Sequence, residues 1–286
     1  MSNRIIITGA NGFIGEELTR HFIAKGYQVT ALVHNFPTNT VDGVEYVKYD
    51  MENNETLLVF SGALVLVHCA YVRIDRNKNA DEINYTGTKN LMEQCHQHNV
   101  KFVFISSFSA HEKALSHYGK TKLKCEQLID TTQDLIIKPG LVIGKKGLAS
   151  EIISKVKSSP FFPLVGNGKQ PLQTVYIHDL CLAIEQLIAK NKTGIYHIAE
   201  ENAISMKQFY STIASALNKR LIFVPIPLNV LVFFTYLFEK LRIPLPISSD
   251  SVLGLKQLRA FDTQRDLAAI GIAVRAYDES ILQVLD

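Results

Sequence analysis

Cysteine is scarce in this chain of 286 residues, and its four cysteines are widely scattered. No two of them form a Cys-x-x-Cys pair, which argues against a disulfide framework or a zinc site and favours a reducing cytoplasm. The nine histidines show no metal-ligand spacing such as His-Glu-x-x-His, so we predict no metal site. The first residues lead into an apolar run without the architecture of a signal peptide, and we therefore expect a cytoplasmic protein.

Charge of one sign is not concentrated anywhere in the sequence. The chain has 30 basic and 27 acidic residues, a net charge of +3, and no charge run longer than the pair Lys145-Lys146. Nucleic-acid binding requires a concentrated basic surface, so we expect no nucleic-acid partner. With 47% hydrophobic and 20% charged residues, the composition is typical of a soluble globular protein that buries a core.

A hydrophobic run long enough to cross a membrane is also absent. The apolar stretch Leu228–Leu241 is bracketed by prolines and is shorter than the span of about 20 residues that a membrane requires. We expect it to form a buried helix beside a substrate pocket. The alternative is a helix that faces lipid or forms a dimer interface. The sequence therefore leaves open whether the chain forms a homodimer, although it shows no interface signature.

Strands and helices alternate through the first half of the sequence. The expected strands are nearly continuous apolar runs, which suit a parallel sheet covered on both faces. They are Arg4–Thr8, Gln28–Val33, Val44–Lys48, Leu64–His68, Phe102–Ser106 and Leu135–Lys138. The expected helices are Phe13–Lys25, Ala80–Gln97, Tyr118–Thr131 and a short one near Glu55–Phe60. This alternation predicts an α/β fold with a doubly wound parallel sheet of the Rossmann type.

Glycine and proline become frequent after Pro139, where the pattern changes. A helix at His178–Ala189 and a strand at Ile195–Ala199 are expected to return to the sheet. We therefore expect a dinucleotide-binding domain over residues 1–145, rejoined by residues 173–200. Residues 146–172 and 201–286 would form a smaller, mostly helical substrate-binding region.

Three glycines, Gly9, Gly12 and Gly15, separate the first expected strand from the first expected helix. Gly9 would permit a tight turn, Gly12 would let a diphosphate approach the backbone, and Gly15 would let the helix pack close to the strand. The helix N-terminus offers free N–H groups and a partial positive charge to the phosphates. The alternative is an ordinary tight turn between a strand and a helix, but the flanking elements favour a dinucleotide site.

The sequence Tyr118-x-x-x-Lys122 is the candidate catalytic pair. On a helix the two side chains lie one turn apart on the same face. A neighbouring ammonium favours the phenolate, so we expect Lys122 to lower the pKa of Tyr118 and let it exchange a proton with a carbinol or carbonyl oxygen. Ser106 and Ser107 end an upstream strand, where a serine can hydrogen-bond the same oxygen. His111 and His117 lie nearby, and we expect no catalytic role for them.

Further segments occur where expected strands end or helices begin. They are His68-Cys69-Ala70, Asn84-x-x-Gly87-Thr88, Lys138-Pro139-Gly140-x-x-x-Gly144, and Gly166-x-Gly168 followed by Val175–Asp179. Together with the glycine loop and the Tyr-Lys pair, these segments in this order resemble the extended branch of the short-chain dehydrogenase/reductase superfamily, to which NAD-dependent epimerases and dehydratases belong.

The resemblance implies nicotinamide redox chemistry and assigns roles to named residues. Ser107, Tyr118 and Lys122 would form the catalytic triad, with Asn84 supporting a proton relay and Asp50 at the acidic position that touches adenine. The residues expected to bind the cofactor are Gly9, Asn11, Gly12, Phe13, Ile14, Gly15, His34, Asp50, Met51, Cys69, Ala70, Tyr118, Lys122, Pro139, Gly140 and Val142. The implied function is an oxidoreductase or epimerase acting on a secondary alcohol or ketone of a sugar or sugar nucleotide.

Two departures from the pattern leave alternatives open. The second strand ends in Val33-His34 rather than in the carboxylate that grips the ribose of NAD, which favours NADP over NAD. The segment 170–174 lacks the arginine that often holds a sugar-nucleotide diphosphate, although Lys169, Arg242 or Arg259 could replace it. An apolar, steroid- or terpene-like carbonyl compound is therefore an alternative substrate. A non-catalytic NADP(H)-binding protein is a further alternative, against which the intact triad counts.

Overall fold

A computed structural model describes residues 3–53, 59–74, 77–240 and 248–285. It divides the chain into two compact units. The first unit consists of Met1–Ser106, Thr121–Lys138 and Ile177–Tyr196, and the second consists of Ser107–Lys120, Pro139–Tyr176 and His197–Asp286. The short helix expected near Glu55–Phe60 lies, over residues 55–58, outside the described residues.

A seven-stranded sheet forms the centre of the first unit, in the order β11-β6-β5-β4-β1-β2-β3. The five neighbouring pairs from β6 to β3 all run parallel. Its strands are β1 (Arg4–Thr8), β2 (Gln28–Val33), β3 (Val44–Lys48), β4 (Ala63–His68), β5 (Lys101–Ile105), β6 (Leu135–Pro139) and β11 (Gly194–Ile198). The order reverses at β1 and β4, as in doubly wound dinucleotide-binding folds, and this confirms the predicted fold class.

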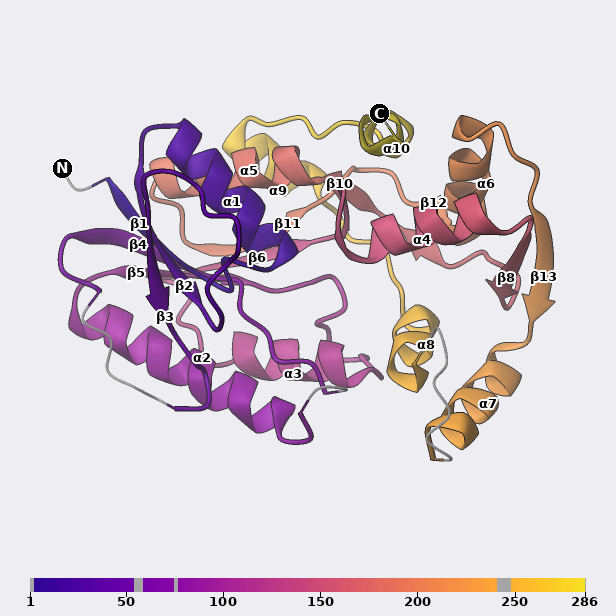
Figure 1. Cartoon of the computed structure of the whole chain (residues 1–286), viewed down its shortest axis with the longest axis horizontal. Helices are drawn as coiled ribbons and strands as arrows, with labels where there is room; N and C mark the ends of the chain where they lie inside the picture. Colours follow the sequence, from indigo (N-terminus) through magenta and orange to yellow (C-terminus); the bar gives the residue numbers. More distant parts are fainter. Residues whose placement is uncertain (1–2, 54–58, 75–76, 241–247, 286) are drawn as a thin grey trace. The chain divides into compact units, whose positions relative to one another are not determined.

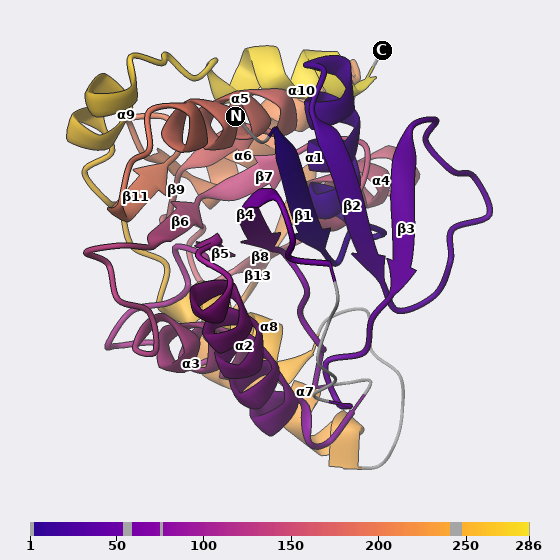
Figure 2. The same ribbon diagram turned by 90° about the vertical axis from the view of Figure 1, so that its left-hand side faces the viewer.

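Helices cover both faces of this sheet (Figures 1 and 2). The helices α1 (Phe13–Ala24) and α5 (Ile177–Ala189) pack against each other on one face, and α2 (Ala80–Gln97) lies on the other. Helix α3 (His117–Glu126) ends five residues before Thr131, where the sequence predicted its end. The Asp130 carboxylate accepts hydrogen bonds from the backbone N–H and hydroxyl of Thr132, and this local turn competes with a further helical turn.

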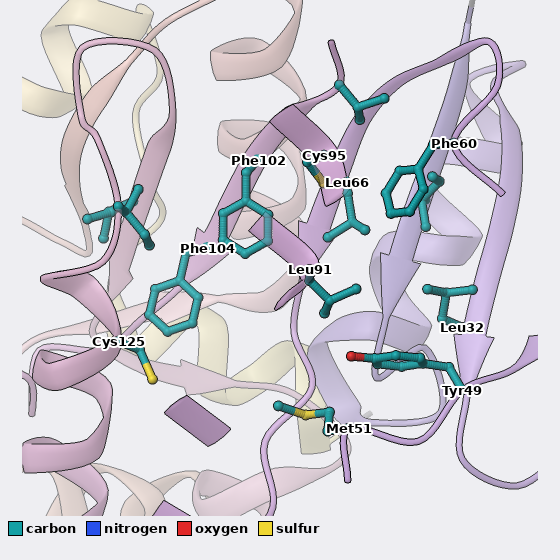
Figure 3. Close-up of a cluster of buried hydrophobic side chains, with 14 of the residues drawn as sticks. Leu32, Tyr49, Met51, Phe60, Leu66, Leu91, Cys95, Phe102, Phe104 and Cys125 are labelled. Carbon is teal, nitrogen blue, oxygen red and sulfur yellow. The ribbon is translucent and has the colours of Figure 1, made fainter. Parts of the chain in front are cut away.

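The core between α2 and the sheet is built from large apolar side chains (Figure 3). Leu66 and Phe102 point from β4 and β5 toward Leu91 and Cys95 of α2, while Phe104 of β5 lies toward Cys125 of α3, and none of the six is more than 2% exposed. Burying each such side chain contributes about 1.5–3 kcal/mol to stability, so the apolar runs of the sequence stabilise the packing of α2 on the sheet.

The second unit combines three two-stranded sheets with helices. Strand β7 (Leu141–Ile143) pairs in parallel with β10 (Thr174–Tyr176), β8 (Phe161–Val165) pairs in parallel with β13 (Ile222–Ile226), and β9 (Pro171–Leu172) pairs antiparallel with β12 (Ile204–Ser205). The helices are α4 (Gly147–Ser158), α6 (Met206–Ala216), α7 (Leu228–Lys240), α8 (Ser249–Lys256), α9 (Gln264–Ile270) and α10 (Tyr277–Leu285). A second hydrophobic core joins α4, β8, α6 and α10.

The expectation of a buried apolar helix at Leu228–Leu241 is wrong for part of its surface. The helix α7 forms, but Phe233 is 62% exposed and Tyr236 is 64% exposed. The apolar residues of this segment predict a helix, but they do not indicate which of its faces packs against another element of the fold. Within the described residues, no helix has the length and apolar character needed to cross a membrane.

Candidate active site

The glycine loop after β1 depends on close backbone packing. Gly9 has a φ of +63°, and a Cβ there would lie 2.7 Å from the backbone nitrogen of Ala70. A Cβ on Gly15 would overlap the carbonyl oxygen of Gly9 and lie 2.9 Å from the Cα of Ala10. The space at Gly15 is thus closed by the loop itself rather than by the strand, and only glycine fits at either position without backbone movement.

The start of α1 offers a place for a diphosphate. Gly12 is the N-cap of the helix, and no side chain caps this end. A Cβ on Gly12 would meet only the oxygen of Gly9, at 3.1 Å, so the rest of its surroundings is open. The side chain of Asn11 donates a hydrogen bond to the carbonyl of Asn35 and ties the loop to the end of β2. A side-chain-free helix N-terminus with open space beside it fits a dinucleotide phosphate.

A buried histidine links the loop side of the sheet to α2. The Nδ1 atom of His68 lies 2.7 Å from the hydroxyl of Thr8, and its Nε2 atom lies 3.1 Å from the hydroxyl of Thr88. The same Thr8 hydroxyl accepts a hydrogen bond of 3.2 Å from the backbone of Ala70. Burial, assisted by the charge of Lys122, lowers the pKa of His68 to about 3. His68 is therefore a neutral connector of the cofactor-side strand ends.

The other motif residues of α2 also hold the cofactor side together. Both N–H groups of the Asn84 side chain donate, to the carbonyls of Val72 and Ala80, and its oxygen accepts from the backbone of Val72. A Cβ on Gly87 would lie 2.9 Å from the Cε of Met51. Asn84 thus holds the chain segment that follows β4, and Gly87 leaves space for Met51. Because both N–H groups of the Asn84 amide are used in these contacts, Asn84 has no free donor for the proton-relay role that the resemblance implies.

The ends of β2 and β3 bring His34 and Asp50 together. The Nδ1 atom of His34 lies 3.5 Å from the Asp50 carboxylate, and the His34 side chain is 67% exposed. Cys69 and Ala70, at the end of β4, are half-buried, and burial raises the pKa of the Cys69 thiol to about 12. These residues come from neighbouring strand ends, where open α/β sheets bind ligands.

The loop after β5 and the start of α3 hold Ser107 and Tyr118 together. A Cβ on Gly119 would overlap the carbonyl oxygen of Ser109, so this glycine lets the loop lie directly on the helix. The backbone N–H of Ser109 donates to the Ser107 hydroxyl at 3.1 Å, and Ser107 hydrogen-bonds the phenol of Tyr118. Tyr118 is half-buried, and its burial raises the pKa of the phenol even though the Ser107 contact lowers it.

Lys122 lies one turn after Tyr118 on α3 and is 4% exposed. Its ammonium donates a hydrogen bond of 2.7 Å to the carbonyl of Ile105 and lies 4.5 Å from the ring centre of Phe104. Burial lowers the pKa of Lys122 to about 8, so it is mostly charged at pH 7. The expected lowering of the Tyr118 pKa by Lys122 is not found in this structure, because burial raises the pKa of the phenol and the hydrogen bond with Ser107 offsets only part of that rise.

Two supports of this helix were not found from the sequence. The carboxylate of Asp250, on α8, accepts from the backbone N–H of His117 at 2.5 Å and of Tyr118 at 3.4 Å, and so caps the start of α3. At the other end of the helix, buried Glu126 pairs with Lys138 at 2.9 Å and accepts from the Ser106 hydroxyl. No local pattern predicts partners so far apart in the chain, although a lysine and a glutamate that are both buried must be paired.

The segment after β6 is expected to run beside the nicotinamide. Pro139 is buried, while Gly140 and Val142 are half-buried. A Cβ on Gly140 would overlap the carbonyl oxygen of Gln173 and lie 2.9 Å from the Cβ of Ala199. Gly140 thus permits the close approach of β7 to β10. The Nε2 atom of His111 lies 3.1 Å from the carbonyl oxygen of Gln257, so His111 links the loop after β5 to the segment that follows α8.

A doubly wound sheet with a glycine loop at the uncapped start of its first helix defines a dinucleotide-binding protein. The profile of the NAD dependent epimerase/dehydratase family matches residues 5–199. The chain belongs to this family, and it is an NAD(P)-dependent enzyme of the extended short-chain dehydrogenase/reductase type.

The names of known relatives refer to different substrates. The UDP-glucose 4-epimerase of Vibrio cholerae is 26% identical over 276 residues, which cover 84% of this chain and 84% of that protein. The sterol-4-alpha-carboxylate 3-dehydrogenase (decarboxylating) of Homo sapiens is 24% identical over 254 residues, 76% of this chain and 67% of that protein. The solved structure of MoeE5 with UDP-glucose and NAD has a TM-score of 0.74 at 19% identity and covers 99% of this chain and 97% of that chain. This structural likeness shows a shared fold.

Proposed function

We propose that this enzyme moves a hydride and a proton to or from a carbon that bears oxygen, with Tyr118 exchanging the proton. The observation that carries the proposal is the hydrogen bond between Ser107 and Tyr118 at the start of α3, the helix that also carries Lys122. A serine that hydrogen-bonds a tyrosine phenol, one helical turn before a buried lysine, is a proton-transfer arrangement with no evident structural purpose.

The first unit holds the cofactor in this proposal. The N-terminus of α1 and the open side of Gly12 would hold the diphosphate, Asp50 and Met51 would lie at the adenine end, and Lys122 would hydrogen-bond the nicotinamide ribose. When bound, the nicotinamide supplies or accepts the hydride. Val33 stands where many NAD enzymes have a carboxylate, and His34 follows it where an arginine often meets the 2′-phosphate of NADP. We therefore propose NADP as the preferred cofactor, with NAD as the alternative.

The second unit contributes the proton and the substrate contacts. The raised pKa keeps the Tyr118 phenol protonated at neutral pH, so it can donate its proton to a carbonyl oxygen during reduction. The Ser107 hydroxyl oxygen accepts from Ser109, and its proton, which meets the Tyr118 phenol here, would polarise the same oxygen once a substrate is bound. Lys122 follows Tyr118 by one turn on the same helix, the spacing at which a cation can favour a phenolate.

The test is Tyr118→Phe, which removes the phenolic hydroxyl and retains the ring. Turnover followed by the absorbance of reduced nicotinamide should fall by about 100-fold or more, because general acid catalysis contributes about 10²–10⁴-fold. Cofactor affinity should remain within a factor of two. Ser107→Ala should show the same pattern with a smaller loss. Full activity in Tyr118→Phe would refute the assignment of the proton donor.

A sugar or sugar nucleotide is the substrate class that we propose first. The Vibrio cholerae relative, which acts on UDP-glucose by its name and aligns over most of both chains, supports this class. The aligned length reaches into the second unit, where substrate contacts are expected.

An apolar secondary alcohol or ketone is the second candidate, and one observation favours it. Gln173 stands near the place where sugar-nucleotide enzymes often have a diphosphate-binding arginine. Its amide is used by the protein itself, donating to the carbonyls of Glu200, Glu201 and Phe261 at 2.9–3.2 Å. Its oxygen accepts from the backbone of Phe261 at 2.8 Å, so this side chain cannot also hold a diphosphate. The sterol dehydrogenase relative supports this second class.

A substrate panel separates these candidates. UDP-glucose, UDP-N-acetylglucosamine and a set of apolar ketones would each be offered with NAD(H) and with NADP(H). Turnover of the sugar nucleotides alone supports the first class, and turnover of the ketones alone supports the second. Tight cofactor binding without turnover of any compound, in wild type as in Tyr118→Phe, would instead support a non-catalytic cofactor-binding protein.

A further inference from the structure

The ladder formed by β8 and β13 has one face in the core and one face in solvent. Phe162 and Leu164 of β8 point into the second hydrophobic core and are 5% and 6% exposed. The alternate positions carry apolar side chains as well, since Phe161 is 59% exposed, its register partner Ile222 is 55% exposed and Val224 is 45% exposed. A strand pair that is apolar on both faces has more hydrophobic surface than its own core can cover.

Exposed apolar side chains also occur on α7, which follows β13 after the single residue Pro227 (Figure 1). Helix α7 packs against α8, and Thr235 of α7 is fully buried. Val230, Phe233 and Phe234, at positions i, i+3 and i+4, share one face and are 43%, 62% and 47% exposed. Tyr236 next to them is 64% exposed. Aromatic side chains thus make up most of this exposed helix face.

The chain that flanks the two strands is rich in cations, and α7 carries one carboxylate, Glu239, near its end. Residues 152–178 contain three lysines and no aspartate or glutamate, and residues 202–238 contain two lysines and one arginine, again with no carboxylate. The Nζ atom of Lys219 donates to the carbonyl of Lys157, which brings the basic ends of β13 and β8 together. Lys157, Lys219 and Arg220 are all exposed. In a chain with 27 acidic residues, two such long carboxylate-free segments in one part of the fold give a local excess of positive charge.

We propose that this apolar-basic surface, made of the outer face of β8–β13 and the exposed face of α7, docks on the surface of an anionic phospholipid bilayer. Exposed aromatic and branched apolar side chains enter the boundary between headgroups and acyl chains, and nearby lysine and arginine side chains bind the anionic headgroups. The surface does not require a membrane-crossing helix, and this inference does not depend on the proposed reaction.

Charge decides between a bilayer and a second copy of the chain as the occupant. A two-fold dimer through this surface would place the same patch on both sides of the interface. It would then bring together the cations of both copies, while α7 contributes only one carboxylate, Glu239, from each copy. Like charges across an interface oppose association, whereas an anionic bilayer complements them.

Co-sedimentation of the full-length chain with lipid vesicles tests the proposal. We expect binding to vesicles of phosphatidylcholine with phosphatidylglycerol, weak binding to phosphatidylcholine alone, and loss of binding at high salt. Replacing Lys219→Gln and Arg220→Gln together should weaken partitioning about 25-fold, since each cation near an anionic surface contributes about fivefold. Phe233→Ser with Phe234→Ser should weaken it by about tenfold or more.

Matched controls lie elsewhere on the chain. Phe36 and Leu282 are 61% and 51% exposed, so Phe36→Ser and Leu282→Ser should leave vesicle binding unchanged. Lys89→Gln is the corresponding charge control, at a lysine with a 53% exposed side chain. Each variant is compared at equal thermal stability and equal cofactor affinity, and the Lys219–Arg220 pair keeps the test valid if the aromatic variant fails to fold.

Three outcomes would overturn the proposal. The first is no binding to anionic vesicles, and the second is equal loss of binding in the control variants. The third is a concentration-dependent dimer in analytical ultracentrifugation that Phe233→Ser with Phe234→Ser dissociates while vesicles bind neither form, which would make a second copy the occupant.

Discussion

The hydroxyl of Thr8, at the end of β1, lies 2.7 Å from the Nδ1 atom of His68, at the end of β4. This contact joins the two central strands of the sheet beside the glycine loop, and Thr88 of α2 holds the other ring nitrogen. The ring is fully buried and its pKa is lowered to about 3, so the folded protein holds it neutral. The geometry of the cofactor side therefore depends on an uncharged histidine.

The stability of the folded chain should decrease as the pH is lowered, because of His68. The pKa is about 3 in the folded chain and about 6.5 in the unfolded chain, so the unfolded state binds the extra proton between these values. The stabilisation is complete above pH 6.5 and is lost at about 1.4 kcal/mol per pH unit below it. Urea unfolding at pH 7.5, 6.5 and 5.5 should show a steeper fall for wild type than for His68→Gln. Thr88→Val, which retains the imidazole, should keep the wild-type slope, and equal slopes in all three would contradict this prediction.

Two glycines of the same loop should respond differently to alanine. Gly15→Ala places a Cβ against the backbone of Gly9 and Ala10, and we expect it to lower the free energy of unfolding by about 1–3 kcal/mol. Gly12→Ala meets only one atom at 3.1 Å and fills the open side of the helix N-terminus, so it should cost little stability and weaken cofactor binding at least about tenfold. Urea unfolding and titration with reduced cofactor measure the two effects. Unchanged cofactor affinity in Gly12→Ala would place the diphosphate elsewhere.

The buried pair of Glu126 and Lys138 should show strong coupling. Its charged atoms are 2.9 Å apart and both side chains are 8% exposed. Glu126→Gln or Lys138→Met leaves one buried charge without its partner, so each should lower the free energy of unfolding by about 3–5 kcal/mol. The double change Glu126→Met with Lys138→Met removes both charges and should cost less than either single variant. Additive losses in this double-mutant cycle would mean that the pair contributes no mutual stabilisation.

Cofactor choice should follow residue 34. His34 is exposed beside Asp50, where the ribose of an adenine dinucleotide is expected. His34→Arg supplies a planar cation for a 2′-phosphate and should raise affinity for NADP by about tenfold or more, while His34→Asp should favour NAD. Affinities measured with both reduced cofactors test this, and His178→Arg, at another exposed histidine, should change neither. A wild-type enzyme that binds NAD much more tightly than NADP would overturn the preference proposed from His34.

The sheet was predictable because each strand is a short apolar run bounded by polar or glycine residues. The observed bounds of β1, β2 and β3 equal the expected ones, those of β4 and β6 differ by one residue at one end, and β5 lies one residue earlier at both ends. The end of α3 was not predictable, because the Asp130 side chain competes for the backbone there. The exposure of α7 was not predictable either, because apolar composition is the same whether a face meets a core or remains open.

The sequence by itself determined the order of elements, the fold class and the glycine loop, because these depend on side-chain periodicity and on backbone conformations that few residues allow. It also identified Ser107 and Tyr118 as candidate catalytic residues, since their local spacing places them after β5 and on α3. Only the tertiary structure decided that Asp250 caps that helix and that Glu126 pairs with Lys138. It likewise decided that burial raises the Tyr118 pKa and that α7 leaves aromatic side chains exposed. These features arise from residues distant in the chain, whose contacts and desolvation exist only after folding.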